Sequence, residues 1–212
     1  MSITTAPVAF WLLPGAADAA SLQARIRDLA RDNGTDDFEP HVTLHADSCC
    51  SEADLEAVLR KVAAASAPLT LGALATADSA VYFKALYVDF HVDIDVDVAG
   101  KGLDAAPLLA LRRRLVGEVL QARASRQDTA ALSLPAPRDL EQALAGYTFL
   151  PHLSLLYGNL PPPLRRRLAA ANDLRGRSIR FDRIAAVRPA AGHADLSKVS
   201  NWEVFGHQRL GG

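Results

Sequence analysis

Apolar positions divide the chain into alternating candidate strands and helices. Residues 8–13 (VAFWLL) are continuously apolar and end at Pro14-Gly15, which is typical of a buried strand. Apolar residues then recur at helical spacing over 22–29, and Asn33-Gly34 supplies residues that tolerate the left-handed turn at a helix end. The opening of the chain therefore predicts a strand followed by a helix.

The rest of the chain continues this mixture of short strands and helices. Strands are expected at 41–46, 69–76, 81–90, 151–157, 179–187 and 202–210, and helices at 51–65, from 107 onward, and at 164–171. No glycine-rich fingerprint of a dinucleotide site or a P-loop accompanies these elements. The pattern favours an α+β fold over a doubly wound parallel sheet.

Composition and charge narrow the class of partner. Half of the 212 residues are hydrophobic, which is enough for a substantial core, and the net charge is −1. Proteins that bind long nucleic acids usually carry a basic surplus, so a small-molecule partner is favoured. We find no signal peptide and no apolar run long enough to span a membrane, and expect a cytoplasmic monomer. Cys49 and Cys50 are adjacent, so we expect them to be reduced.

One seven-residue motif occurs twice. FEPHVTL at 38–44 matches FLPHLSL at 149–155, and His152 follows His41 by 111 residues. The phenylalanine, proline, histidine and final leucine recur in register, and coincidence is on the order of one in a thousand. The natural interpretation is a pair of lobes built from a duplicated unit.

Each copy of the motif predicts one imidazole and one hydroxyl on the same face of a strand. Successive side chains of a strand point to opposite faces, so His41 shares a face with Thr43, and His152 with Ser154. If the two lobes pack about a pseudo-twofold axis, the two pairs face each other across one cleft.

Two facing histidines suit in-line attack of water on phosphorus. One takes the proton of the water while the other protonates the departing oxygen, and an ordinary pKa near 6.5 lets one be neutral and one protonated. Thr43 and Ser154 would donate hydrogen bonds to the non-bridging phosphate oxygens. Neither a metal nor a cofactor is required. The near symmetry of the motifs leaves open which histidine is the base.

Three other interpretations of the motif compete with this one. Both histidines could be satisfied core residues, although the repetition of the whole motif argues against it. A zinc site could add His45 on the same strand face and take a further ligand from Asp47 or His152, but hydroxyl groups are poor zinc ligands. A module could bind a phosphate without turning it over, but binding alone requires no acid and base.

The repeated His-x-Thr/Ser-x motif resembles that of the 2H phosphoesterase superfamily. Within it, the chain is most similar to cyclic nucleotide phosphodiesterases of plant and yeast type, over WLLP at 11–14, VYFKALY at 81–87, YTFLPHLSLLY at 147–157 and WEV at 202–204. The resemblance implies a two-lobed, pseudo-twofold α+β fold, in which each lobe is an antiparallel sheet flanked by helices. The active site would lie in the cleft between the lobes.

The resemblance also implies an activity and a set of site residues. The activity is metal-independent hydrolysis of a 2′,3′-cyclic nucleotide or of ADP-ribose 1″,2″-cyclic phosphate to a monoester, without a cofactor. The implied residues are His41 and His152 for catalysis, Thr43, Ser154 and Tyr157 for the phosphate, and Trp11 and Phe83 either beside a base or in the core. Tyr157 would reach the cleft only if the chain bends near Gly158. The alternative within the superfamily is an RNA-end-processing 2′-5′ phosphodiesterase or ligase-like enzyme, for which a basic groove is expected.

One stretch departs from the compact pattern of such proteins. Residues 122–139 are polar, small and proline-bearing, which predicts a mobile loop within a single domain spanning 1–212. Its Arg123, Arg126 and Arg138 could meet a second phosphate or simply face solvent.

Overall fold

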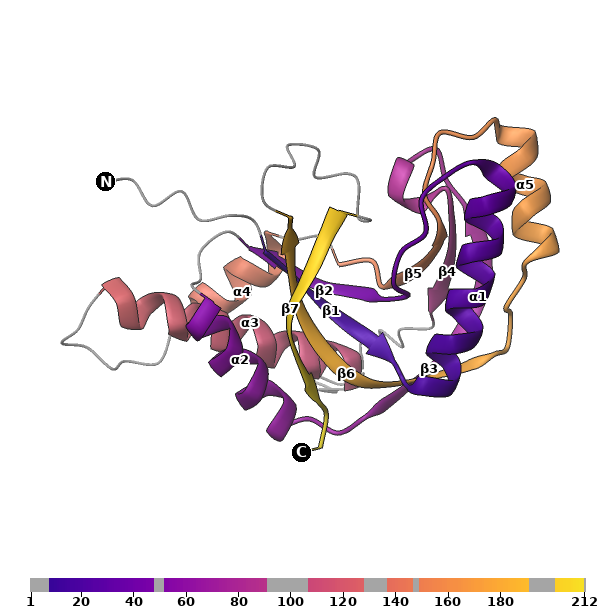
Figure 1. Cartoon of the computed structure of the whole chain (residues 1–212). Coiled ribbons are helices and arrows are strands. Elements are labelled where there is room, and N and C mark those ends of the chain that lie inside the picture. The colour runs from indigo at the N-terminus through magenta and orange to yellow at the C-terminus, as the bar shows by residue number, and fades with distance from the viewer. Residues whose placement is uncertain are drawn as a thin grey trace, which may run out of the picture.

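A computed structural model describes residues 8–47, 52–90, 107–127, 137–146, 149–190 and 201–211. The strands in these segments are β1 Val8–Pro14, β2 Val42–Asp47, β3 Leu69–Asp78, β4 Leu86–Phe90, β5 His152–Leu156, β6 Ser178–Pro189 and β7 Trp202–Arg209. The helices are α1 Ala16–Asn33, α2 Glu52–Ala64, α3 Pro107–Gln127, α4 Pro137–Ala145 and α5 Pro162–Ala171, and a 3₁₀ turn, η1, covers Tyr82–Lys84 (Figure 1). The sequence pattern predicted all of these strands and every helix except α4 and η1.

The seven strands that the structure describes form one antiparallel sheet in the order β1–β2–β5–β4–β3–β6–β7, in which β1 also pairs with β6. One half of this sheet, β2–β1–β6–β7, lies in one lobe, and the other half, β5–β4–β3–β6, lies in the other lobe. Strand β6 belongs to both because residues 178–181 pair with β3, whereas residues 181–187 pair with β1. The predicted two-lobed α+β fold is confirmed, with β6 shared by the two halves and the pairing of β2 with β5 as their second connection.

Helices cover both halves of the sheet, and α1 contacts a strand of each half. Helix α1 packs on β1 and β5, α5 packs on β3 and β4, α2 packs on β6 and β7, and α3 packs on α2 and β2. Figure 1 shows α1 and α5 together on one side of the molecule and α2, α3 and α4 on the other. Leu22 and Ile26 of α1 and Leu115 and Val119 of α3 are fully buried, so the core lies between the helices and the sheet.

The two lobes meet where β2 lies beside β5. Val42 lies opposite Leu153 in antiparallel register, and these residues occupy the same position in the two copies of the motif. The pseudo-twofold axis expected from the repeat therefore passes beside this pair. Because each partner of the pair is flanked by a histidine and a hydroxyl residue, the register brings both motifs to one surface.

The strand predicted at 81–90 begins later than expected. Residues 82–84 form η1, and β4 starts only at Leu86. Two hydrogen bonds hold η1 against β5: Ser154 Oγ donates to the Phe83 carbonyl at 2.7 Å, and Gly158 N donates to the Tyr82 carbonyl at 2.9 Å. Local propensity could not reveal these bonds, since Ser154 and Phe83 are 71 residues apart in the chain.

The loop predicted at 122–139 is wrong at both ends. Helix α3 continues to Gln127 and α4 begins at Pro137, while residues 128–136 lie outside the described residues. Alanine, arginine and glutamine are good helix formers, and proline is favoured at the first helical position. The Arg123 guanidinium also binds both carboxylate oxygens of Asp47 at 2.6 and 2.9 Å, which ties the end of α3 to β2.

The structure does not test the prediction that Cys49 and Cys50 are reduced, because both residues lie outside the described residues. Among the helices that the structure describes, none is both long and apolar enough to cross a membrane.

Candidate active site

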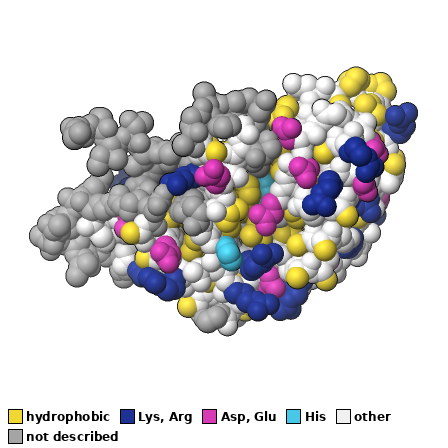
Figure 2. All heavy atoms as spheres, in the orientation of Figure 1, with side chains coloured by type: hydrophobic (Ala, Val, Ile, Leu, Met, Phe, Trp, Pro, Cys, Tyr) yellow, Lys and Arg dark blue, Asp and Glu magenta, His cyan; other side chains and the backbone are white. Residues whose placement is uncertain are grey.

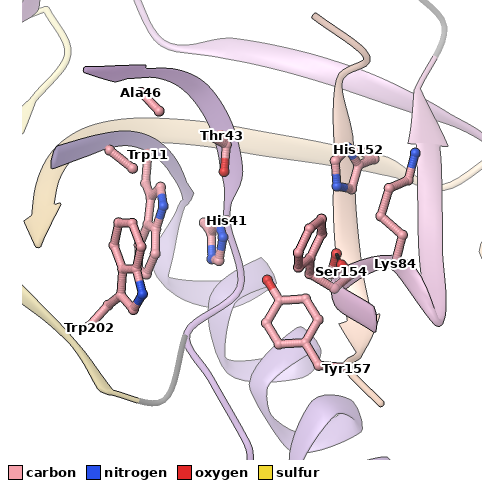
Figure 3. Close-up of a pocket in the computed structure, with 11 residues that line it drawn as sticks. Trp11, His41, Thr43, Ala46, Lys84, His152, Ser154, Tyr157 and Trp202 are labelled. Carbon is pink, nitrogen blue, oxygen red and sulfur yellow. Dashed lines mark hydrogen bonds between the residues drawn. The ribbon is translucent and has the colours of Figure 1, made fainter. Parts of the chain in front are cut away.

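A pocket of about 230 Å³ lies where the lobes meet, beside the Val42–Leu153 pair (Figure 3). Its lining residues are Ala9, Trp11, His41, Thr43, Ala46, Phe83, Lys84, His152, Ser154, Tyr157 and Trp202. The structure thus brings together all seven residues that sequence analysis nominated. Figure 3 shows the two histidines on opposite sides of the pocket, one on each lobe.

A β-bulge determines which side chains of β2 reach the pocket. Trp11 lies opposite Thr43, whereas Phe10 lies opposite His45, so β2 has one extra residue at this point. The bulge turns His45 away from the pocket, where it is buried, and Ala46 lines the pocket instead. Simple alternation, which placed His45 on the face of His41, is wrong here.

The zinc interpretation loses its geometric basis with this bulge. Its additional ligands were to be His45 with Asp47 or His152. His45 does not line the pocket of His41 and His152, and the Asp47 carboxylate, 3.7 Å from His45 Nε2, is bound by Arg123. In the part of the chain that the structure describes, no three His, Cys, Asp or Glu side chains converge on a common point that could hold a metal ion.

Both histidines are oriented by the same backbone device. His41 Nδ1 lies 2.6 Å from the Glu39 carbonyl, and His152 Nδ1 lies 2.7 Å from the Leu150 carbonyl. A carbonyl oxygen can only accept, so Nδ1 carries the proton in each ring. Nε2 is therefore the atom that gains or loses a proton on the pocket side.

Burial makes the two histidines differ in basicity. Desolvation lowers the pKa of His41 to about 4, against a smaller opposing effect of the Glu39 carbonyl. Desolvation is also the main cause that lowers the pKa of His152, with Lys84 lowering it further and Asp89 opposing. His152 is only partly buried, whereas His41 is buried. The pKa of both histidines is therefore lowered, and that of His41, at about 4, keeps this ring neutral at pH 7 and well into the acidic range.

Three hydroxyl groups line the floor between the histidines. Thr43 and Ser154 lie on the strands that carry His41 and His152, as the repeat predicts. Tyr157 follows the end of β5, stacks on Phe38 at 3.9 Å and is hydrogen-bonded to Ser154. Burial raises the pKa of Tyr157 well above its ordinary value, so the phenol keeps its proton and can donate it in a hydrogen bond.

Trp11 packs against the ring of His41. The indole stacks on the imidazole with a centroid distance of 3.7 Å and an angle of 7°, and its other neighbour is Trp202 at 6.4 Å. Trp11 is only 4% exposed. This burial favours a positioning role for Trp11 and leaves Trp202, the partly exposed end of the stack, as the indole that a base could reach.

Two residues of the pocket were missed by sequence analysis. Trp202 was noted only as part of a family-like stretch, and Lys84 was noted only within VYFKALY. A lone cation in an apolar, aromatic run was the available signal for Lys84. No sequence signal placed Trp202 near the first histidine, because β7 and β1 meet only through β6.

Charged side chains around the site are mixed in sign. Figure 2 shows basic and acidic side chains interleaved over the face in view. Many arginines of the described residues pair with carboxylates, among them Arg165 with Asp78 and Arg177 with Asp18. This face does not form the broad basic groove expected of a protein that binds long RNA.

The two lobes each carry one copy of the repeated motif at a common pocket, and a comparison with protein families agrees with this arrangement. The family model of the 2'-5' RNA ligase superfamily matches residues 19–193. The chain therefore belongs to the 2'-5' RNA ligase superfamily, which confirms the superfamily inferred from the repeated motif. Its closer placement among plant- and yeast-type cyclic phosphodiesterases is not confirmed.

Solved structures resemble this fold over nearly its whole length. The protein TT0787 of Thermus thermophilus is 14% identical, with a TM-score of 0.57 over 97% of this chain and 98% of that one. Escherichia coli LigT, in a complex with 3'-AMP, is 12% identical, with a TM-score of 0.50 over 97% of this chain and 98% of that one. At these identities the likeness concerns the fold. No curated protein sequence matches the chain.

Proposed function

We propose that this protein hydrolyses a cyclic phosphodiester, a 2′,3′-cyclic nucleotide or ADP-ribose 1″,2″-cyclic phosphate, to a phosphomonoester. The observation that carries the proposal is the pair of imidazoles that face one pocket, each with its Nδ1 bound to a backbone carbonyl and its Nε2 left for proton transfer. A small pocket of mixed polarity favours a nucleotide-sized substrate over a long chain.

The reaction assigns opposite tasks to the two histidines. His41, whose pKa of about 4 keeps it neutral, takes a proton from water on Nε2 as the water oxygen bonds to phosphorus. The bond from phosphorus to the ribose oxygen breaks on the opposite side, and this oxygen receives the proton of His152 Nε2. The two rings exchange protonation states, and the product gains the elements of one water molecule.

The hydroxyl groups serve the phosphate through the turnover. Thr43 lines the pocket and would donate to one non-bridging oxygen of the phosphate. Tyr157 keeps its proton and would donate to another, in competition with its hydrogen bond to Ser154. Ser154 now donates to the Phe83 carbonyl, so a phosphate must compete with that carbonyl for the proton. Ser154 therefore acts both on the substrate and on the position of η1.

Hydrolysis of the four 2′,3′-cyclic nucleotides and of ADP-ribose 1″,2″-cyclic phosphate in EDTA tests the proposal. We expect EDTA-resistant turnover that falls by about 10²- to 10⁴-fold in His41→Ala and in His152→Ala. His207→Ala is the matched control, because His207 is exposed on β7 outside the pocket. Turnover that EDTA abolishes, or that survives both catalytic substitutions, would overturn the proposal.

A second candidate function is hydrolysis or joining of a 2′-5′ linkage at an RNA end. Aromatic side chains at both ends of the pocket favour it: Trp202 lies beside Trp11 on the His41 side, and Phe83, 47% exposed, lies on η1 beside β5. A linkage has a nucleoside on each side of phosphorus, whereas a cyclic nucleotide has one. LigT, which shares the fold, has been crystallised with 3'-AMP, a nucleoside monophosphate.

A direct comparison of substrates separates the two candidates. If the protein is a cyclic phosphodiesterase, we expect it to hydrolyse cytidine 2′,3′-cyclic phosphate faster than the 2′-5′ dinucleotide ApA at equal concentration. A dinucleotide preference that is lost in both Trp202→Ala and Phe83→Ala would instead establish the RNA-end function.

A further inference from the structure

Among the described residues that line the pocket, Lys84 is the only lysine or arginine. It belongs to η1, and Figure 3 shows it on the same side of the pocket as His152. On the His41 side, the pseudo-twofold that relates the two motifs places no matching lysine or arginine among the pocket residues that the structure describes. Lys84 thus makes the two halves of the site electrostatically different.

The position of Lys84 is fixed by the strand that carries His152. The hydrogen bonds from Ser154 and Gly158 of the β5 region to the carbonyls of Phe83 and Tyr82 hold both residues that precede Lys84. Its ammonium group lies 4.1 Å from the centre of the Tyr87 ring, which packs edge-on against His152. Contacts to backbone and to an aromatic ring place the charge without neutralising it.

Lys84 makes no ion pair with any residue that the structure describes, unlike Arg165 and Arg177. Its charge nevertheless acts on the site, since it is one of the causes that lower the pKa of His152; Asp89 opposes it. Lys84 is half-buried and lines the pocket beside His152, where an ammonium group is suited to an anionic ligand.

We propose that Lys84 binds a non-bridging oxygen of the substrate phosphate and stabilises the negative charge that accumulates there during attack by water. This deepens, and rests on, the proposed phosphodiester chemistry. A cyclic diester carries one negative charge, and deprotonation of the attacking water by His41 adds a second to the pentacoordinate phosphorus. Lys84 therefore contributes more to the transition state than to the bound substrate.

The substitutions Lys84→Met and Lys84→Arg test this role, with Lys61→Met as the matched control. Lys61 lies on α2, is exposed and pairs with Glu118 away from the pocket. We expect Lys84→Met to lower kcat by about 10²-fold with a smaller change in KM, because removing one such donor typically has this effect. Lys84→Arg restores part of kcat, and Lys61→Met stays near wild type. Unchanged kcat in Lys84→Met overturns the proposal.

Sulfur substitution identifies the oxygen that Lys84 contacts. Wild type should discriminate between the two diastereomers of uridine 2′,3′-cyclic phosphorothioate, because only one places sulfur, a weak hydrogen-bond acceptor, against Lys84. The discrimination should collapse in Lys84→Met. Equal discrimination in wild type and variant would show that Lys84 does not contact a non-bridging oxygen.

Binding of inorganic phosphate distinguishes failure of this inference from failure of the proposed function. In His41→Ala, which removes the proposed base, phosphate should still bind, and adding Lys84→Met should weaken its affinity at least about tenfold. That result supports the Lys84 contact even if no cyclic substrate is turned over. Equal affinity in the single and double variants overturns the contact.

Discussion

The nitrogen of each histidine that faces away from the pocket is bound to the carbonyl two residues earlier in the chain. This local contact, 2.6 Å for His41 and 2.7 Å for His152, follows from the repeated motif and is the same in both lobes. The surroundings differ, because His41 is buried against Trp11 while His152 is partly exposed near Lys84 and Asp89. Equal motifs thus give two histidines of unequal basicity.

Because the pKa values of both histidines are lowered, we predict an acidic pH optimum. His41 must be neutral to act as base, so kcat/KM should fall below a pH of about 4. His152 must be protonated to act as the acid, and its pKa is lowered from the ordinary 6.5. The fall of kcat/KM on the alkaline side should therefore begin below pH 6.5. The profile of kcat/KM against pH from 3.5 to 8.5 measures both limits. An optimum above pH 7 would contradict the assignment of base and acid.

Trp202 offers a separate test at the residue scale. Its indole is partly exposed at the end of the stack that begins with His41, so Trp202→Ala should raise KM for a cyclic nucleotide by about tenfold or more through lost base stacking. A ribose 2′,3′-cyclic phosphate without a base is the control substrate and should show little change. Equal losses for both substrates would instead indicate damage to the support of His41.

At the scale of elements, η1 is held in place by hydrogen bonds from β5, the strand that carries His152, and from the residue just beyond it. Gly158, just beyond β5, has φ of +153° and donates its N–H to the Tyr82 carbonyl. A Cβ at this position would lie 3.2 Å from Thr35 Cγ2. The turn after Tyr157 therefore needs glycine both for its backbone conformation and for space.

Gly158→Ala should destabilise the fold by about 1–3 kcal/mol and also reduce activity, because it strains the contact that positions η1 and Lys84. Gly34→Ala is the matched control: Gly34 also has positive φ, at +65°, but a Cβ there meets nothing within 4 Å. Urea unfolding with kcat/KM measured in parallel checks the prediction. A Gly158→Ala enzyme that is no less stable than Gly34→Ala, with unchanged kcat/KM, would refute it.

Part of this fold and of the candidate site could be predicted from the sequence. Hydrophobic spacing predicts all seven strands among the described residues, and the repeated motif predicts the catalytic pair and its hydroxyl partners. These features depend on neighbours in the chain. The site residues nominated in this way all line one pocket, although their roles stay predictions.

The features that sequence reasoning missed depend on distant contacts. The β-bulge that turns His45 inward arises from pairing with β1, and η1 replaces the start of a predicted strand through bonds to β5. Helix α3 extends beyond its predicted end, where Arg123 reaches Asp47 on β2. The hydrophobic periodicity of a segment carries no information about such distant partners. The predictions therefore failed where a strand departs from simple alternation and where a helix or strand begins or ends.

At the scale of the whole molecule, the lobes are joined by the shared strand β6 and by the pairing of β2 with β5 beside the pocket. Strand β6 contributes to both halves of the sheet, and the histidine motifs lie together on β2 and β5. The site is therefore part of the contact between lobes, and burying His41 there affects stability as well as catalysis. Folding removes this imidazole from water while it must stay neutral.

Acidification should therefore weaken the fold through His41. The pKa of His41 is about 4 in the folded protein and about 6.5 when unfolded, so between these values the unfolded chain binds more protons. Stability from the neutral ring is fully present above pH 6.5 and is lost as pH falls to 4, by about 3 kcal/mol. Below pH 4 both states are protonated and this loss stops.

Urea unfolding at pH 7.0 and pH 4.5 measures the effect in wild type, His41→Gln and His207→Gln. His41→Gln removes the titrating group, so its loss of stability on acidification should be smaller than that of wild type by about 2–3 kcal/mol. His207→Gln, at an exposed position on β7, should keep the full loss. If wild type and His41→Gln lose stability equally, burial does not hold His41 neutral. The acidic limit of activity would then have to come from another group.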